Sequence, residues 1–143
     1  MNRIESMCRD VVESVDGGTA ARVVDIVTGR VLGVHDSTRD HSVYDDAVAA
    51  AVVALFGSID VGPMWLALRK PMEEDSEVRS LHFHEFEITT ERGYHLAKLL
   101  KTGKSVMVLE TAKTSHLGVG WAQLAALVPA MVAVLSSSSG GEP

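Results

Sequence analysis

The sequence predicts an α/β (α+β) domain with the element order α-β-β-α-β-β-β-α. Residues 4–15 place apolar side chains three and four positions apart, as one face of an amphipathic helix requires. From residue 81 the period changes to two, which is typical of a half-buried strand. Residues 45–56 form an alanine-rich segment with almost no polar face, as expected of a helix that is buried on several sides.

The composition is that of a globular domain. The 143 residues are 46% hydrophobic and 22% charged, and a chain of this size buries about two-thirds of its unfolded surface. We expect a single domain over residues 1–135, followed by a disordered Ser/Gly tail over residues 136–143. The net charge of −6 argues against a nucleic-acid partner. The charged amphipathic start of the chain does not resemble a signal peptide, so a cytoplasmic location is expected.

The first half of the chain is predicted to hold a helix, a hairpin and a second helix. The first helix ends at Asp16-Gly17-Gly18. Two segments rich in β-branched residues, 21–27 and 30–35, then flank Thr28-Gly29 and predict a tight β-hairpin. Ser42 and Asp45 resemble a capping box that opens the alanine-rich helix, and solvation or the helix dipole accounts for its first two aspartates.

The second half is predicted to form a three-stranded meander and a final helix. The strands are expected over residues 81–88, 94–100 and 105–110. Before them, residues 63–71 could form a short helix and residues 73–77 an acidic loop. Thr114 or Ser115 can cap the final helix, its glycines permit a close approach to the sheet, and Pro129 should kink or end it.

The segment from Leu117 to Leu135 allows two interpretations. Gln123 is its only clearly polar side chain, and its length approaches that of a membrane span. Two glycines, one proline and five alanines make it a weak span, and no Lys or Arg follows it. We therefore favour a core helix and expect no membrane span, with a membrane anchor as the alternative.

No residue pattern indicates a metal site or a cofactor. His82 and His84 would project from the same face of a strand, but a metal site needs a third and usually a fourth ligand. The single Cys8 falls within a predicted helix and is interpreted as a buried thiol. The chain has no nucleophile elbow, Walker loop or dinucleotide fingerprint. We expect a protein that is not an enzyme and has no cofactor.

In this order of elements, four segments resemble the bacterial roadblock/dynein light chain family, whose small α/β domain is related in shape to longin and profilin-like folds. They are the hairpin VDIVTGRVL of residues 24–32, the alanine-rich helix, the segment ITTERGY of residues 88–94, and the passage from VMVL (106–109) into HLGV (116–119). The last segment is similar to the family's strand followed by an Asn-Leu-Gly helix start, with His116 in place of Asn.

The resemblance implies a five-stranded antiparallel sheet with the central helix on one face and the terminal helices on the other. It also implies a homodimer, in which the central helices lie side by side and the third strands pair. Small side chains at i, i+3, i+4 and i+7 of the alanine-rich helix would let two helices approach closely. The expected interface residues are Ala47, Ala50, Ala51, Ala54, Phe86 and Ile88.

The resemblance also implies a class of partner. Family members bind small Ras-like GTPases or act as adaptors in larger complexes, so we expect a non-catalytic homodimeric regulator or scaffold for such a GTPase or for a signalling or motility complex. The alternative is a profilin-like domain that senses a small ligand or a metal. In that case Met64, Trp65 and the histidines would line a pocket on the sheet.

Overall fold

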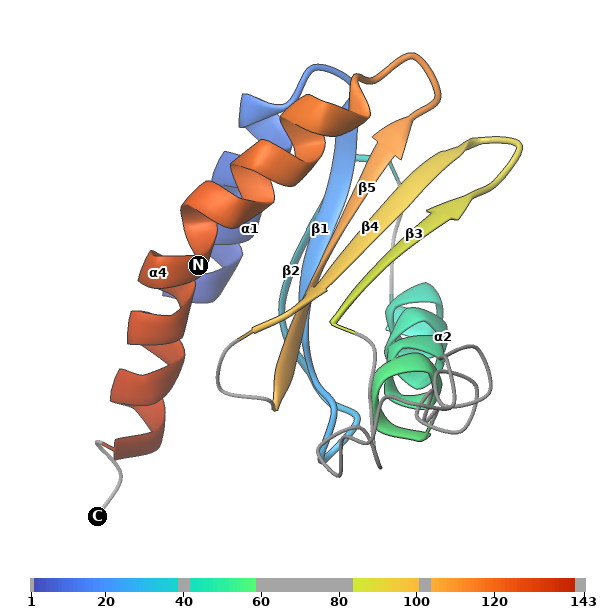
Figure 1. Cartoon of the computed structure of the whole chain (residues 1–143). Helices are drawn as coiled ribbons and strands as arrows, with labels where there is room; N and C mark the ends of the chain where they lie inside the picture. The colour runs from blue at the N-terminus through green and yellow to red at the C-terminus, as the bar shows by residue number, and fades with distance from the viewer. Residues whose placement is uncertain (1, 39–41, 59–83, 101–103, 141–143) are drawn as a thin grey trace, which may run out of the picture.

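The computed structural model describes residues 2–38, 42–58, 84–100 and 104–140, and they contain the eight predicted elements (Figure 1). In chain order these are α1 (Arg3–Ser14), β1 (Gly18–Asp25), β2 (Val31–Asp36), α2 (Ser42–Val53), β3 (Glu85–Thr89), β4 (Gly93–Leu99), β5 (Ser105–Ala112) and α4 (Leu117–Gly140). A π-helical turn, η1 (Ala54–Ser58), extends α2. The short helix and acidic loop predicted between residues 63 and 77 lie outside the described residues.

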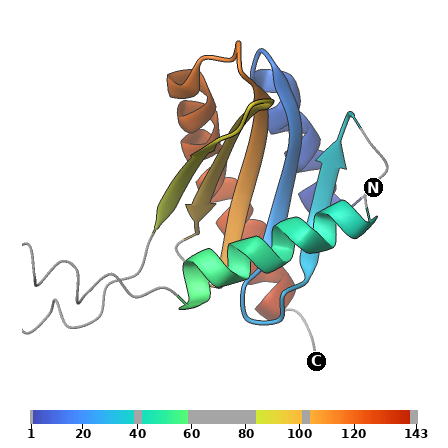
Figure 2. The ribbon, with the colours of Figure 1, turned by 90° about the vertical axis from the view of Figure 1, so that its right-hand side faces the viewer.

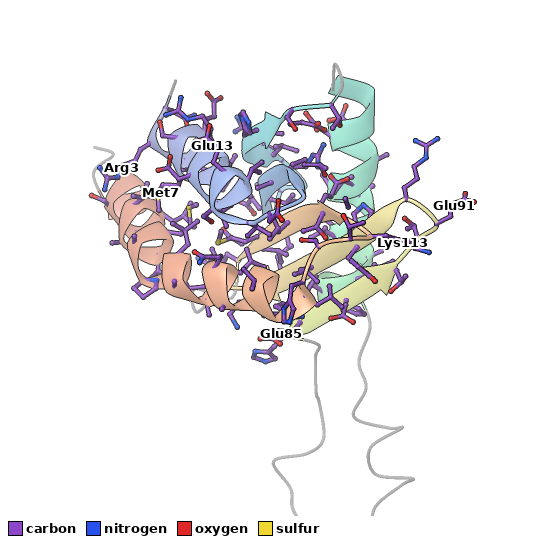
Figure 3. All side chains as sticks on the ribbon, turned by 90° about the horizontal axis from the view of Figure 1, so that it is seen from above. Arg3, Met7, Glu13, Glu85, Glu91 and Lys113 are labelled. Carbon is purple, nitrogen blue, oxygen red and sulfur yellow. The ribbon has the colours of Figure 1, made fainter. Side chains whose placement is uncertain are left out.

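The five strands form one sheet in the order β2-β1-β5-β4-β3, and every neighbouring pair is antiparallel. Helices α1 and α4 cover one face, whereas α2 runs across the strands on the other (Figure 1, Figure 2 and Figure 3). The predicted fold class is therefore confirmed. The two faces alternate along each strand, so that Met107 and Leu109 of β5 pack under α1 and α4, while Val106 and Val108 pack under α2.

The first helix begins and packs as its sequence predicts. The Asn2 side chain caps it by accepting the backbone N–H of Glu5 at 2.8 Å. Met7, Cys8 and Val11 are buried against the sheet. The Cys8 thiol is fully buried, and this burial, together with the charge of Glu5, raises its pKa to about 12. It is the buried thiol that the sequence predicts.

The hairpin between β1 and β2 has a longer loop than predicted. The first strand ends at Asp25 instead of Val27, and residues 26–30 form the connection. The Asp25 carboxylate accepts the backbone N–H groups of Val27 and Thr28, at 2.8 and 3.1 Å, which competes with strand pairing at this point. Gly29 has a φ of 76°, which a β-branched residue rarely adopts. A two-residue turn was therefore the wrong prediction.

The start of α4 differs from the predicted one. His116 caps the helix, because its ring Nδ1 accepts the backbone N–H of Val119 at 3.3 Å. Ser115 instead donates its hydroxyl to the backbone oxygen of Asp16 at 2.6 Å, so the prediction that Thr114 or Ser115 caps the helix is wrong. Gly120 permits the close approach that was predicted, since a Cβ there would lie 2.8 Å from the Leu96 side chain.

The rest of α4 is longer than expected, and only part of it is buried. The helix does not end at Pro129 and includes residues 136–140, where the sequence predicts the start of a disordered tail. Leu117–Ser137 is long and apolar enough to cross a membrane by length and composition, and only 22% of its most apolar window is buried. The core helices of many soluble proteins pass the same test of length and composition, so this result favours neither interpretation.

Candidate functional site

Arg22 lies at the centre of a buried group of charged side chains beneath α2. Its position in β1 directs it to the same face as Val24, toward α2, and its side chain is 0% exposed. Three carboxylates from three elements surround it. Its Nη2 donates to Asp36 of β2 at 2.8 Å, its Nε donates to Asp45 of α2 at 2.7 Å, and its Nη1 pairs with Glu110 of β5.

The surrounding carboxylates keep this guanidinium charged. Burial on its own would lower the pKa of Arg22, because it removes water from the charged form. The hydrogen bond to Asp45 and the charges of Glu110 and Asp45 outweigh this effect and raise the pKa above its ordinary value. We call Arg22, Asp36, Asp45, Glu110 and the adjoining His95 the Arg22 cluster.

The Arg22 cluster is the part of the site that the sequence reasoning missed. Asp45 was interpreted as solvated or as a partner of the helix dipole, but it is 8% exposed and bonded to Arg22. The available signal was charge within apolar strands. Arg22 precedes Val23-Val24, and Glu110 follows Val108-Leu109, so each charge continues a run of core residues. A charge at such a position requires a partner in the fold.

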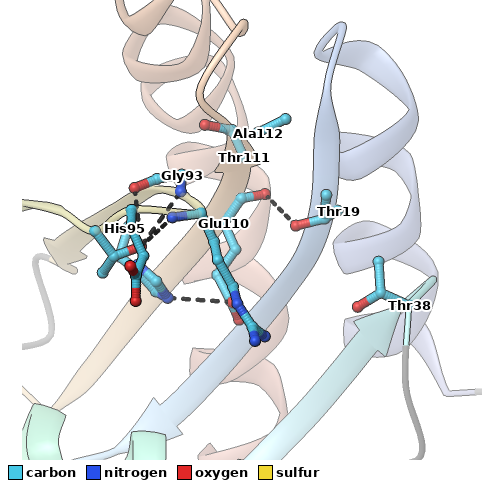
Figure 4. A pocket seen from close by; sticks show the side chains of 10 residues that line it. Thr19, Thr38, Gly93, His95, Glu110, Thr111 and Ala112 are labelled. Carbon is cyan, nitrogen blue, oxygen red and sulfur yellow. Dashed lines mark hydrogen bonds and ion pairs between the residues drawn. The ribbon is translucent and has the colours of Figure 1, made fainter.

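A polar cavity of about 530 Å³ opens beside the Arg22 cluster (Figure 4). His95 and Glu110 lie in it, with Gly93 and Ala112 on the same strands and Thr19 and Thr38 on the opposite side. The His95 Nε2 lies 3.2 Å from a carboxylate oxygen of Glu110, so this nitrogen carries the donor hydrogen. The His95 Nδ1 is buried, and no described residue pairs with it. It therefore has hydrogen-bonding capacity that no described residue uses.

The outward side of α2 consists of small apolar side chains. Ala49, Val52 and Phe56 are buried against the sheet, whereas the four predicted interface alanines are exposed in the single chain: Ala47, Ala50, Ala51 and Ala54. We call these four residues the α2 outer face. No element of the described chain covers them.

The predicted interface residues of β3 lie in two different environments. Phe86 is half-buried within its own chain, and its ring packs edge-on against Phe56 with 5.0 Å between the centroids. Ile88 is 40% exposed. β3 is the last strand of the sheet, and among the described residues its outer edge is paired with no other strand. Through Phe86, this edge strand contacts Phe56 at the end of α2.

The other residues considered for chemistry are not brought together. His84 is exposed, while His82, Met64 and Trp65 lie outside the described residues. Within the described ranges, no group of three or more His, Cys, Asp or Glu side chains has a geometry that could hold a metal ion. The fold thus presents two features of interest, namely the α2 outer face with the edge of β3, and the polar cavity at His95.

Solved structures with the same arrangement of elements identify the fold. A roadblock/LC7 domain from Streptomyces avermitilis superimposes with a TM-score of 0.72 and 14% identity, over 94% of this chain and 99% of that one. The chain has the roadblock/LC7 fold. MglB from Myxococcus xanthus shares this fold with a TM-score of 0.71 and 10% identity, over 96% of this chain and 98% of that one.

The roadblock/LC7 fold also resembles profilin, as the sequence predicts. Profilin from Schizosaccharomyces pombe superimposes with a TM-score of 0.59 and 11% identity, covering 92% of this chain and 98% of that one. At such identities the likeness concerns the fold alone. The sequence matches no protein-family model and no curated protein.

Proposed function

We propose that this protein is a non-catalytic homodimeric regulator or scaffold that binds a small Ras-like GTPase or a larger signalling or motility complex. The observation that carries the proposal is the α2 outer face. Four alanines lie exposed on one side of a helix that has hardly any polar side chain to interact with water. A second copy of the chain would remove this surface from water and, by pairing β3 with β3, would also satisfy the open edge of the sheet.

The GTPase partner is supported by the family that the sequence resembles and by the roadblock/LC7 fold. A regulator of this type would act by holding the catalytic loops of the GTPase itself. Among the described arginines, Arg22 is fully buried and is used within the fold, so it is not available for insertion into another active site. Arg22 therefore cannot be an inserted catalytic arginine, and we propose that binding depends on surfaces of the dimer.

Two measurements test this function. Sedimentation velocity should give the mass of a dimer at micromolar concentration. Small GTPases from the same organism, loaded with GDP or with a GTP analogue, should then be captured by the immobilised protein in one nucleotide state more than in the other. A monomer in sedimentation contradicts the dimer, and the absence of binding in both nucleotide states contradicts the GTPase assignment.

The polar cavity favours a second candidate function, the sensing of a small ligand. Its volume of about 530 Å³ is within the range of ligand pockets, and the buried His95 Nδ1 pairs with no described residue. A ligand at 100 times its dissociation constant would add about 2.7 kcal/mol to the free energy of unfolding. Thermal unfolding with a panel of metabolites and divalent metals separates the two functions, because an adaptor would show no shift.

A further inference from the structure

Helix α2 carries two nearly equivalent faces. The buried set is Asp45, Ala49, Val52 and Phe56. The set one position later in the sequence is Asp46, Ala50, Val53 and Gly57. Both sets have an aspartate, an alanine and a valine in the same order. They differ in residue type only at the last position, which is Phe56 in one set and Gly57 in the other. One residue corresponds to a rotation of about 100° around the helix axis, so apolar burial alone does not select the face along the first turns.

Two contacts distinguish these faces. Near the start of α2, the Asp45 carboxylate accepts from the Arg22 Nε at 2.7 Å, whereas Asp46 is exposed. Near the end, Phe56 packs on Phe86, and the alternative face has only a glycine to offer. Because 11 residues are close to three full helical turns, Asp45 and Phe56 lie on the same side of the helix.

The arginine is well suited to fix a rotation because its own position is fixed by the sheet. Asp36 of β2 and Glu110 of β5 hold two of its nitrogens from two different strands. The Nε is left to bond with α2. Rotating α2 away would separate a buried ion pair, which is costly because both charges have already lost their water.

We propose that Arg22 is a positioning residue for α2. Its choice of Asp45 over Asp46 fixes the rotation of the helix on the sheet, and it thereby determines that the α2 outer face points away from the chain. The contact that this face makes with a second copy rests on the proposed function. The rotation itself is a property of the single chain and is tested separately.

Thiol labelling of single residues measures this rotation. The reporter is Ala49→Cys, on the sheet-facing side. The native Cys8 serves as an internal reference, because it is fully buried on the other face of the sheet. Asp45→Leu removes the bond to Arg22 and leaves Asp46 as the alternative partner. We expect it to raise the labelling rate at position 49, relative to Cys8, by roughly tenfold or more, since a hydrogen bond to a charged group contributes at least that factor. Asp46→Leu is the matched control and should leave the ratio unchanged.

A second reporter separates rotation from fraying of the helix. Position 50 is exposed in the native chain, so with Ala50→Cys a rotated helix carries the thiol toward the sheet and Asp45→Leu should slow its labelling. Faster labelling at position 49 with no slowing at position 50 would mean local melting and would overturn the proposal, as would an unchanged ratio at position 49. If Asp45→Leu unfolds the whole domain and exposes Cys8, the milder variant Asp45→Asn replaces it in the test. It should give a smaller increase at position 49, and no increase overturns the proposal.

The same variants keep this inference apart from the proposed function. Sedimentation velocity of the unmodified chain reports whether it dimerises, and the labelling ratios report the rotation of α2. If the chain is a monomer and Asp45→Leu raises the labelling rate at position 49, the dimer is contradicted but the positioning role is supported. If the chain is a dimer and that rate does not change, the positioning role is contradicted but the dimer is supported.

Discussion

Arg22 is the residue on which most of the polar structure of this protein depends. It joins β1 to β2, α2 and β5 through the carboxylates of Asp36, Asp45 and Glu110. The Glu110 carboxylate also lies 3.2 Å from His95 on β4. Exchanging a whole buried ion cluster for apolar residues is often neutral, but removing one partner is costly, because the remaining charges stay buried. We therefore expect the stability of the fold to depend on this arginine.

Replacing Arg22 by an apolar residue tests this dependence. Arg22→Met should lower the free energy of unfolding by about 3–5 kcal/mol, because Asp36, Asp45 and Glu110 lose the guanidinium that they share. Urea unfolding followed by circular dichroism measures the change. The control is Arg92→Met, in the exposed β3–β4 turn, which should change the stability by less than about 0.5 kcal/mol. Equal midpoints for the two variants would contradict the central role of Arg22.

At the start of helix α4, His116 caps the helix, which is the role that an asparagine can play at this position. In the segment that resembles the roadblock family, His116 stands in place of the usual Asn. The imidazole Nδ1 accepts the backbone N–H of Val119, as an asparagine oxygen would do at a helix start. The helix is therefore capped by the residue that departs from the family pattern, while Ser115 joins the α1–β1 connection through Asp16.

The capping role of His116 predicts different effects for two substitutions. His116→Asn retains an acceptor and should preserve the stability, whereas His116→Ala removes it and should cost about 1 kcal/mol. Thermal or urea unfolding gives the free energies, and hydrogen exchange of the Val119 amide locates the change. If both variants lose the same amount of stability, the ring nitrogen does not cap α4.

The molecule as a whole has an apolar outer layer on each side of its sheet. On one side, the α2 outer face is uncovered beside the open edge of β3. On the other, only 22% of the most apolar window of α4 is buried. Our proposal assigns the first surface to a second copy of the chain, and the second surface provides a natural comparison for testing that assignment.

A charge placed on each surface tests which one mediates dimerisation. Ala50→Arg should weaken self-association on the order of 100-fold or more, because a desolvated charge in a close helix contact costs several kcal/mol. Ala125→Arg places the same charge on the exposed side of α4 and should leave the dimer intact. Sedimentation equilibrium measures both dissociation constants. A dimer that survives Ala50→Arg would exclude the α2 outer face from the interface.

The sequence by itself determined the type and order of the elements. Helices and strands differ in their apolar period, which is a local property, so α1, the β4–β5 hairpin and the alanine-rich helix could all be predicted from short windows. The predicted boundaries were wrong at two places, where a side chain competes with regular secondary structure for backbone hydrogen bonds. Side chains of Asp25 and His116 bond to nearby backbone groups and move the end of β1 and the cap of α4.

Only the tertiary structure decided which carboxylates pair with Arg22 and which side of α2 faces outward. The partners of Arg22 lie 14, 23 and 88 positions away along the chain, so no local pattern could pair them. The two faces of α2 also have nearly the same composition, and the sequence could not choose between Asp45 and Asp46. Only the folded sheet, which brings Arg22 beneath the start of the helix, distinguishes these two aspartates, because burial makes one of them an ion-pair partner and leaves the other in water.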